Sequence, residues 1–195
     1  MLDILFYCFA AAAALVGLYL LGAAAVRVAR RVGATYLKFR GTRVVVCTET
    51  RRYVAVEVDA PHAAATAARG RSELRLTSCT RWPEREGCDQ DCVWQIERAP
   101  EDCAARSMLA AFYEGKSCAL CHDPIPPLRW DEHHPALLRR ADRRTLEWGE
   151  VPAETLPEVL STHLPVCWDC HVAETFRLAH PELVTDRDSR LAAHV

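Results

Sequence analysis

The residues best suited to chemistry are two similar pentapeptides in the C-terminal half of the chain. They read Cys118-Ala-Leu-Cys121-His122 and Cys167-Trp-Asp-Cys170-His171. Thiolates and imidazoles are ligands of transition metals, and structural zinc sites commonly take their four sulfurs from two Cys-x-x-Cys pairs. This spacing therefore favours a bound metal or cofactor over a plain disulfide framework.

The surroundings of both pairs favour zinc. The first pair is followed by turn residues 123–127, and the second opens a predicted helix, whose N-terminal amides favour thiolate charge. A knuckle, a hairpin-like stretch and a cysteine pair at a helix start resemble the treble-clef and zinc-ribbon type of zinc module over residues 116–180. The resemblance implies one zinc ion with four ligands, Cys118, Cys121, Cys167 and Cys170, and it leaves His122 and His171 outside the ligand set. The stretches 81–85 and 165–171 also resemble uncharacterised bacterial membrane-anchored proteins, a likeness that names no activity.

Each pentapeptide also resembles the haem-attachment motif of c-type cytochromes. That resemblance implies a dihaem electron carrier with two covalently attached haem c groups, bound by the cysteines and axially ligated by His122 and His171. Two observations weigh against it. Haem attachment is an extracytoplasmic process, whereas the flanking charges predict a cytoplasmic location. Four further cysteines, Cys79, Cys88, Cys92 and Cys103, would have no role in it.

A second alternative is a degenerate HNH-like nuclease. HNH endonucleases are similar in having a short histidine-containing segment, here residues 131–134, between two cysteine pairs. In that family a histidine of this segment, His133 or His134 here, is the general base. The sequence has no Asn where that family uses Asn or His as a metal ligand, and residues 109–195 carry 9 basic against 14 acidic side chains. Such a charge repels phosphate, so no nucleic-acid partner is expected.

A second group of cysteines precedes these motifs. Cys88 and Cys92 are four residues apart, which on a helix would place both thiols on one face. With Cys79, and with Cys47 preferred over Cys103 as the fourth ligand, they predict a second zinc site. An iron–sulfur cluster and unliganded thiols remain alternatives, and two disulfides would lead if the domain lay outside the cytoplasm.

An apolar segment near the N-terminus predicts a membrane span. Residues 4–26 form an uncharged run, which as a helix spans roughly 34 Å, enough for a bilayer core of about 30 Å. Asp3 precedes this run, and six basic residues follow it by position 43. Because Lys and Arg favour the cytoplasmic side, we expect a single-pass protein of the inner or plasma membrane, with the N-terminus outside and the soluble part cytoplasmic.

These elements predict an α+β chain built from an N-terminal transmembrane helix and two small cysteine-rich, metal-stabilised units. The expected organisation is a transmembrane helix at 1–26, a basic juxtamembrane linker at 27–41, an α+β unit at 42–115 containing a β-hairpin, and a treble-clef-like unit at 116–195. Such small units bury little apolar surface, so zinc would supply folding free energy. The predicted function is a membrane-tethered, zinc-stabilised binding or accessory module with no evident catalytic site, in contact with the lipid bilayer and a protein partner.

Overall fold

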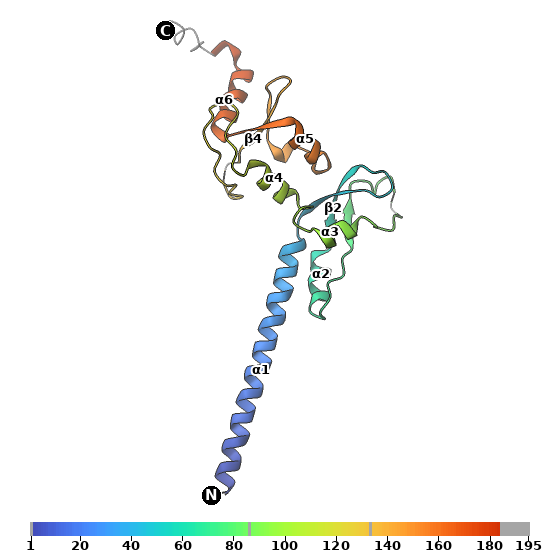
Figure 1. The fold of residues 1–195 in the computed structure, drawn as a ribbon, viewed down its shortest axis with the longest axis vertical. Coiled ribbons are helices and arrows are strands. Elements are labelled where there is room, and N and C mark those ends of the chain that lie inside the picture. The colour runs from blue at the N-terminus through green and yellow to red at the C-terminus, as the bar shows by residue number, and fades with distance from the viewer. Residues whose placement is uncertain (1, 86, 133, 184–195) are drawn as a thin grey trace. The chain divides into compact units, whose positions relative to one another are not determined.

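The computed structural model describes residues 2–85, 87–132 and 134–183 (Figure 1). Its fold is a mixture of helices and small antiparallel sheets, as the sequence predicts. Contacts divide the chain into two compact units, residues 1–101 and 102–195. We call these the proximal and the distal unit and describe each by itself.

The proximal unit begins with one long helix, α1, spanning Leu2–Phe39. Its stretch Ala12–Phe39 is long and apolar enough to cross a membrane, and none of its most apolar part is buried against the rest of the chain. The basic segment expected as a linker at 27–41 is thus helical up to Phe39. A continuous helix satisfies its backbone hydrogen bonds internally, and no Pro interrupts this segment.

The predicted hairpin is present and is extended to three strands. β1 (Thr42–Val46) pairs antiparallel with β2 (Tyr53–Val58), which pairs antiparallel with β3 (Leu76–Cys79). The β-branched valines Val44, Val45, Val54 and Val56 are buried. β1 and β3 both end beside a cysteine, so the sheet delivers Cys47 and Cys79 at strand ends.

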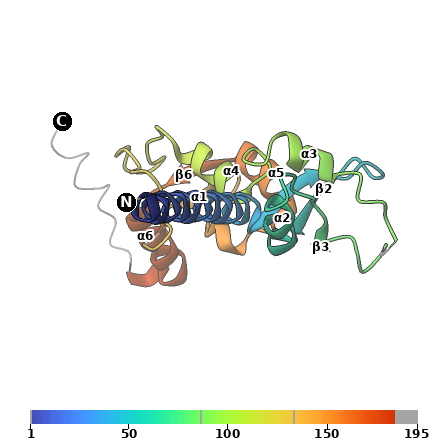
Figure 2. The ribbon, with the colours of Figure 1, turned by 90° about the horizontal axis from the view of Figure 1, so that it is seen from below.

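A short alanine-rich helix, α2 (Ala60–Ala67), packs against the C-terminal part of α1 (Figure 2). Its small buried residues allow the two backbones to approach closely, and on α1 the side chains of Val32, Thr35 and Phe39 share the face that is shielded from solvent. Asp59 caps the helix by accepting a hydrogen bond from the His62 amide at 2.9 Å. A last helix, α3 (Val93–Arg98), completes this unit.

The distal unit surrounds a second three-stranded sheet. Its order is β5–β4–β6, and β4 (Ala136–Arg139) pairs antiparallel with both β5 (Thr145–Leu146) and β6 (His163–Val166). In the described part of this unit, the sheet is accompanied by the helices α4 (Ala105–Tyr113), α5 (Leu156–Thr162) and α6 (Trp168–Ala179). Three short 3-10 turns, Trp148–Glu150, Ala153–Thr155 and Pro181–Leu183, connect or follow these elements.

The core of the distal unit is small and includes a cysteine. Leu137 and Val166 from the sheet are fully shielded, and Tyr113 of α4 packs with them while its hydroxyl donates to the Ala136 carbonyl at 2.9 Å. Cys118 belongs to the same buried cluster. The sheet, two helices and the first Cys-x-x-Cys turn are therefore held together by one apolar core.

Candidate metal centre

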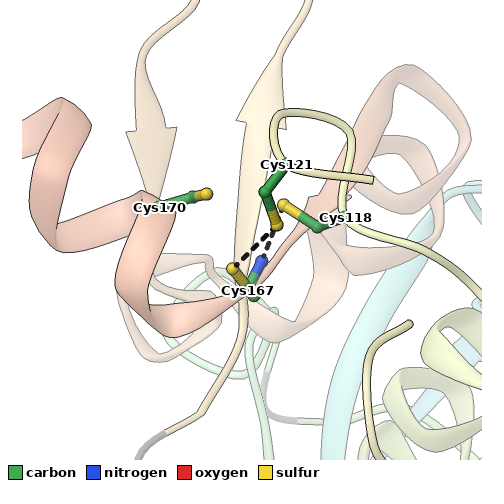
Figure 3. Close-up of side chains that lie close together, drawn as sticks. All are labelled: Cys118, Cys121, Cys167 and Cys170. Atoms are coloured by element: carbon green, nitrogen blue, oxygen red, sulfur yellow. Dashed lines mark hydrogen bonds between the residues drawn. The ribbon is translucent and has the colours of Figure 1, made fainter. Parts of the chain in front are cut away.

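Four cysteines of the distal unit converge on one point, as the sequence predicts. The sulfurs of Cys118, Cys121, Cys167 and Cys170 all lie within 4.8 Å of one another, and no disulfide joins them (Figure 3). The Sγ atoms of Cys121 and Cys167 are 3.8 Å apart. Such a group of soft ligand atoms can hold a metal ion.

The first pair lies on a tight turn that local backbone bonds define. The amide of Cys118 donates to the Asp123 carbonyl at 2.8 Å, and the amide of His122 donates to the Cys118 carbonyl at 3.0 Å. His122 adopts a left-handed φ of 65°, which reverses the chain after Cys121. The turn therefore projects both sulfurs to the same side.

The second pair lies at the junction of β6 and α6. Cys167 is the N-cap residue of α6, and Cys170 lies in the first turn of that helix. The Ala119 amide donates to the Pro165 carbonyl of β6 at 2.9 Å, and the Cys167 amide donates to Cys118 Sγ at 3.4 Å. These two hydrogen bonds join residues that are 46 and 49 positions apart in the sequence. They hold the turn of the first pair against the start of α6.

The surroundings of the Cys118 sulfur stabilise its thiolate form. Burial alone raises the pKa of this thiol, but amide hydrogen bonds from Cys121, Cys167 and Leu120 outweigh that effect and lower the pKa to about 6. Amide donors that converge on one atom stabilise an anion there. Cys118 is thus the thiolate anchor of the group.

The neighbouring thiols hold their protons more tightly. Burial, followed by hydrogen bonds with Cys167, Cys121 and Cys118, raises the pKa of Cys170 far above its ordinary value. The hydrogen bond from the Asp123 amide lowers the pKa of Cys121, but partial desolvation and the bonds with Cys118 and Cys167 outweigh it and raise the pKa to about 11. Crowded thiols resist acquiring like charges, and a divalent cation at their centre removes that resistance.

The two histidines of the pentapeptides lie in different surroundings. His171 is only 8% exposed, and both its ring nitrogens have partners: Nδ1 lies 2.8 Å from Thr145 Oγ1, and Nε2 lies 3.5 Å from Glu147 Oε1. His122 is exposed to solvent. Neither belongs to the group of converging ligand atoms. The sequence offers no local signal for Thr145 and Glu147, which reach His171 only through the fold.

Of the two adjacent histidines between the cysteine pairs, the structure describes only His134. His133 lies outside the described residues. The ring of His134 packs edge-on against Trp148, with centroids 4.8 Å apart, and lies 6.2 Å from Trp130. His134 is therefore part of an aromatic cluster beside the core.

The proximal unit gathers the other four predicted ligands around a small cavity. Cys47, Cys79, Cys88 and Cys92 all line a space of about 50 Å³. Among the described residues the distal set is the one whose ligand atoms all lie within 4.8 Å of one another, so the proximal sulfurs are more widely spaced. Cys103 does not line this cavity and belongs to the distal unit.

The prediction that Cys88 and Cys92 lie one helical turn apart is wrong. α3 begins only at Val93, with Cys92 as its N-cap, and Gln90 has a left-handed φ of 56°. The Gln90 side chain accepts a hydrogen bond from the Leu76 amide at 2.9 Å, which ties this segment to β3 in a non-helical conformation. A tertiary hydrogen bond thus overrides the local i, i+4 pattern.

No protein-family model, curated protein or solved structure matches this chain.

Proposed function

We propose that this protein is a membrane-tethered binding or accessory module whose distal unit is stabilised by one zinc ion. The observation that carries the proposal is the convergence of four sulfurs within 4.8 Å. Zn–S bonds of about 2.3 Å in a tetrahedron require sulfurs about 3.8 Å apart. Cys121 and Cys167 have this separation, 3.8 Å.

A single zinc ion accounts for the site better than two haem groups do. Both Cys-x-x-Cys pairs face one centre, whereas a dihaem protein needs a separate porphyrin site for each pair. His171, the axial ligand that a haem at the second pair would use, is instead held by Thr145 and Glu147. The order of turn, β4–β5 hairpin, β6 and helix start agrees with a treble-clef arrangement with an inserted helix.

A binding role suits the site better than catalysis. Four thiolates fill the tetrahedral coordination of zinc, and a catalytic zinc keeps one position open for water or substrate. His134, a candidate base of the nuclease alternative, packs against Trp148 and is not among the converging ligand atoms. The acidic distal unit and the membrane helix favour a protein partner at the cytoplasmic face of the bilayer over a nucleic acid.

The test is metal analysis and absorption spectroscopy of the full-length protein purified in detergent. We expect zinc bound to the wild type, no Soret band, and loss of one zinc equivalent in Cys118→Ser. Cys103→Ser is the matched control, since it changes another buried cysteine of the same unit that is outside the converging group. Covalently retained haem, or unchanged zinc in Cys118→Ser, would overturn the proposal.

A further inference from the structure

We propose that Cys47, Cys79, Cys88 and Cys92 form a second zinc site, which the proximal unit closes around the ion. This site uses none of the distal ligands and does not depend on them. It would give the small proximal sheet the cross-link that its limited core lacks.

The first argument is convergence from separate elements. Cys47 follows β1, Cys79 ends β3, Cys92 caps α3 and Cys88 lies in the segment between them, yet all four line the same cavity. A space of about 50 Å³ suits one ion bound by side chains better than an iron–sulfur cluster of several heavy atoms. Among the described residues no disulfide joins these four cysteines, and a bound ion would account for their convergence.

The second argument is the way glutamine side chains hold the cavity walls. The Gln95 amide forms two bonds with Val46 at the end of β1: Nε2 donates to the carbonyl at 2.7 Å, and Oε1 accepts from the amide at 3.0 Å. This pair of hydrogen bonds holds α3, and hence Cys92, beside Cys47. Gln90 does the same for the segment after Cys88 by binding the Leu76 amide.

The third argument is the supply of hydrogen-bond donors to sulfur. Arg81 Nη1 donates to Cys47 Sγ at 3.0 Å, and Glu49 holds Arg81 at 3.3 Å and Arg85 at 3.2 Å. The indole nitrogen of Trp82, which also lines the cavity, is buried with no partner among the described residues. Four thiolates around a divalent ion leave a net negative charge, and these donors suit it.

The remaining step is a small closure. The four sulfurs are less closely grouped than the distal set, and Cys88 is the one that does not lie at or beside β1, β3 or α3. We therefore infer that Cys88 is the ligand that moves. Metal ligation and local folding are coupled in such sites. Zinc would therefore draw Cys88 inward while β1, β3 and α3 stay in place.

The experiment counts zinc in the full-length protein in detergent by elemental analysis. We expect two equivalents in the wild type, one in Cys88→Ser, and one in Cys121→Ser, which is the matched change in the distal set. Loss in Cys121→Ser with no loss in Cys88→Ser would overturn this inference and leave the proposed distal site intact. The reverse result would support this inference and overturn the distal site.

A measurement on the wild type keeps the test independent of variant folding. Thiol alkylation followed by peptide mapping should show that zinc protects Cys47, Cys79, Cys88 and Cys92, and that chelation with EDTA exposes all four. Resistance to alkylation after chelation, with a mass lower by two hydrogens per pair, would mean disulfides and overturn the inference. Iron in place of zinc, with visible absorption, would overturn it as well.

Discussion

At the scale of single residues, the distal cysteines divide into an anchor and its neighbours. Cys118 is 1% exposed and receives amide hydrogen bonds, whereas Cys121 is exposed at the outer side of the group. The buried anchor is connected to the apolar core, so metal binding and packing of the distal unit depend on each other. We therefore expect metal binding at this group to depend on pH.

Zinc binding to the distal site should strengthen as pH rises. Near pH 7 Cys118, with a pKa of about 6, is already a thiolate, whereas Cys121, with a pKa of about 11, and Cys170, whose pKa is also raised, still carry protons that zinc must displace. At least two displaced protons imply an affinity that rises at least about 100-fold per pH unit between pH 6.5 and 8. Competition with a chromogenic chelator in the Cys88→Ser variant measures this slope, and an affinity independent of pH would contradict the assignment.

The two pentapeptide histidines should respond differently to the same substitution. His171→Asn removes bonds to Thr145 and Glu147 from a buried position and should lower stability by about 1–3 kcal/mol while the zinc content stays unchanged. His122→Asn, the matched control, changes an exposed residue at a left-handed φ that Asn tolerates, so its effect should be small.

Thermal unfolding followed by circular dichroism, together with zinc analysis, measures both variants. Equal destabilisation by the two substitutions would contradict the structural role of His171. Zinc loss in His171→Asn alone would place that histidine in the ligand set.

At the scale of elements, close packing in the proximal unit depends on small residues. Ala63 of α2 has no exposed surface and lies in the helix that packs on α1. Ala65, two residues further along the same helix, is exposed. The same substitution at both positions changes helix propensity equally, so a difference in stability between the two variants reports on packing.

Ala63→Leu should destabilise the proximal unit by about 1–3 kcal/mol, because a larger side chain cannot fit at this fully buried position without displacing its neighbours. Ala65→Leu, with the same change on the exposed side, should leave stability within about 0.5 kcal/mol. Urea unfolding in detergent, followed by circular dichroism, compares the variants. Similar midpoints for both would mean that the Ala63 side of α2 is not buried in the folded protein.

At the scale of the whole molecule, charge is distributed unevenly along the chain. Five basic residues lie in the helical or adjoining segment 27–40, and Arg43 is buried, where its guanidinium donates to the Pro100 carbonyl at 2.7 Å. Arg43 therefore belongs to the packing of the proximal unit. The positive charge that flanks the apolar part of α1 is consequently concentrated in 27–40.

We predict that residues 27–195 face the cytoplasm, since these basic residues follow the apolar segment whereas the acidic Asp3 lies before it. A membrane-impermeant maleimide applied to intact cells should not label Ala173→Cys, an exposed position on α6, until the membrane is permeabilised. Asp3→Cys, on the other side of the span, is the control that should be labelled in intact cells. Labelling of Ala173→Cys but not of Asp3→Cys in intact cells would mean that the orientation is the reverse of the predicted one.

The elements that local patterns determine were predictable. The uncharged run indicated the N-terminal helix, the alternating valines indicated the β1–β2 hairpin, and the cysteine pairs indicated a shared centre, which Cys118, Cys121, Cys167 and Cys170 form. Hydrophobic period and ligand spacing are properties of neighbouring residues, so the sequence carries them directly. The zinc identity, the orientation and the partner remain predictions.

The tertiary structure decided what depends on residues far apart in the chain. His171 is held by Thr145 and Glu147, 26 and 24 residues before it, and no local pattern announces that contact. Cys88 and Cys92 looked helical by spacing, but Gln90 binds the Leu76 amide and keeps the segment irregular. A side-chain hydrogen bond to a strand outweighs a weak helix propensity over a few residues, because an isolated short helix is unstable in water.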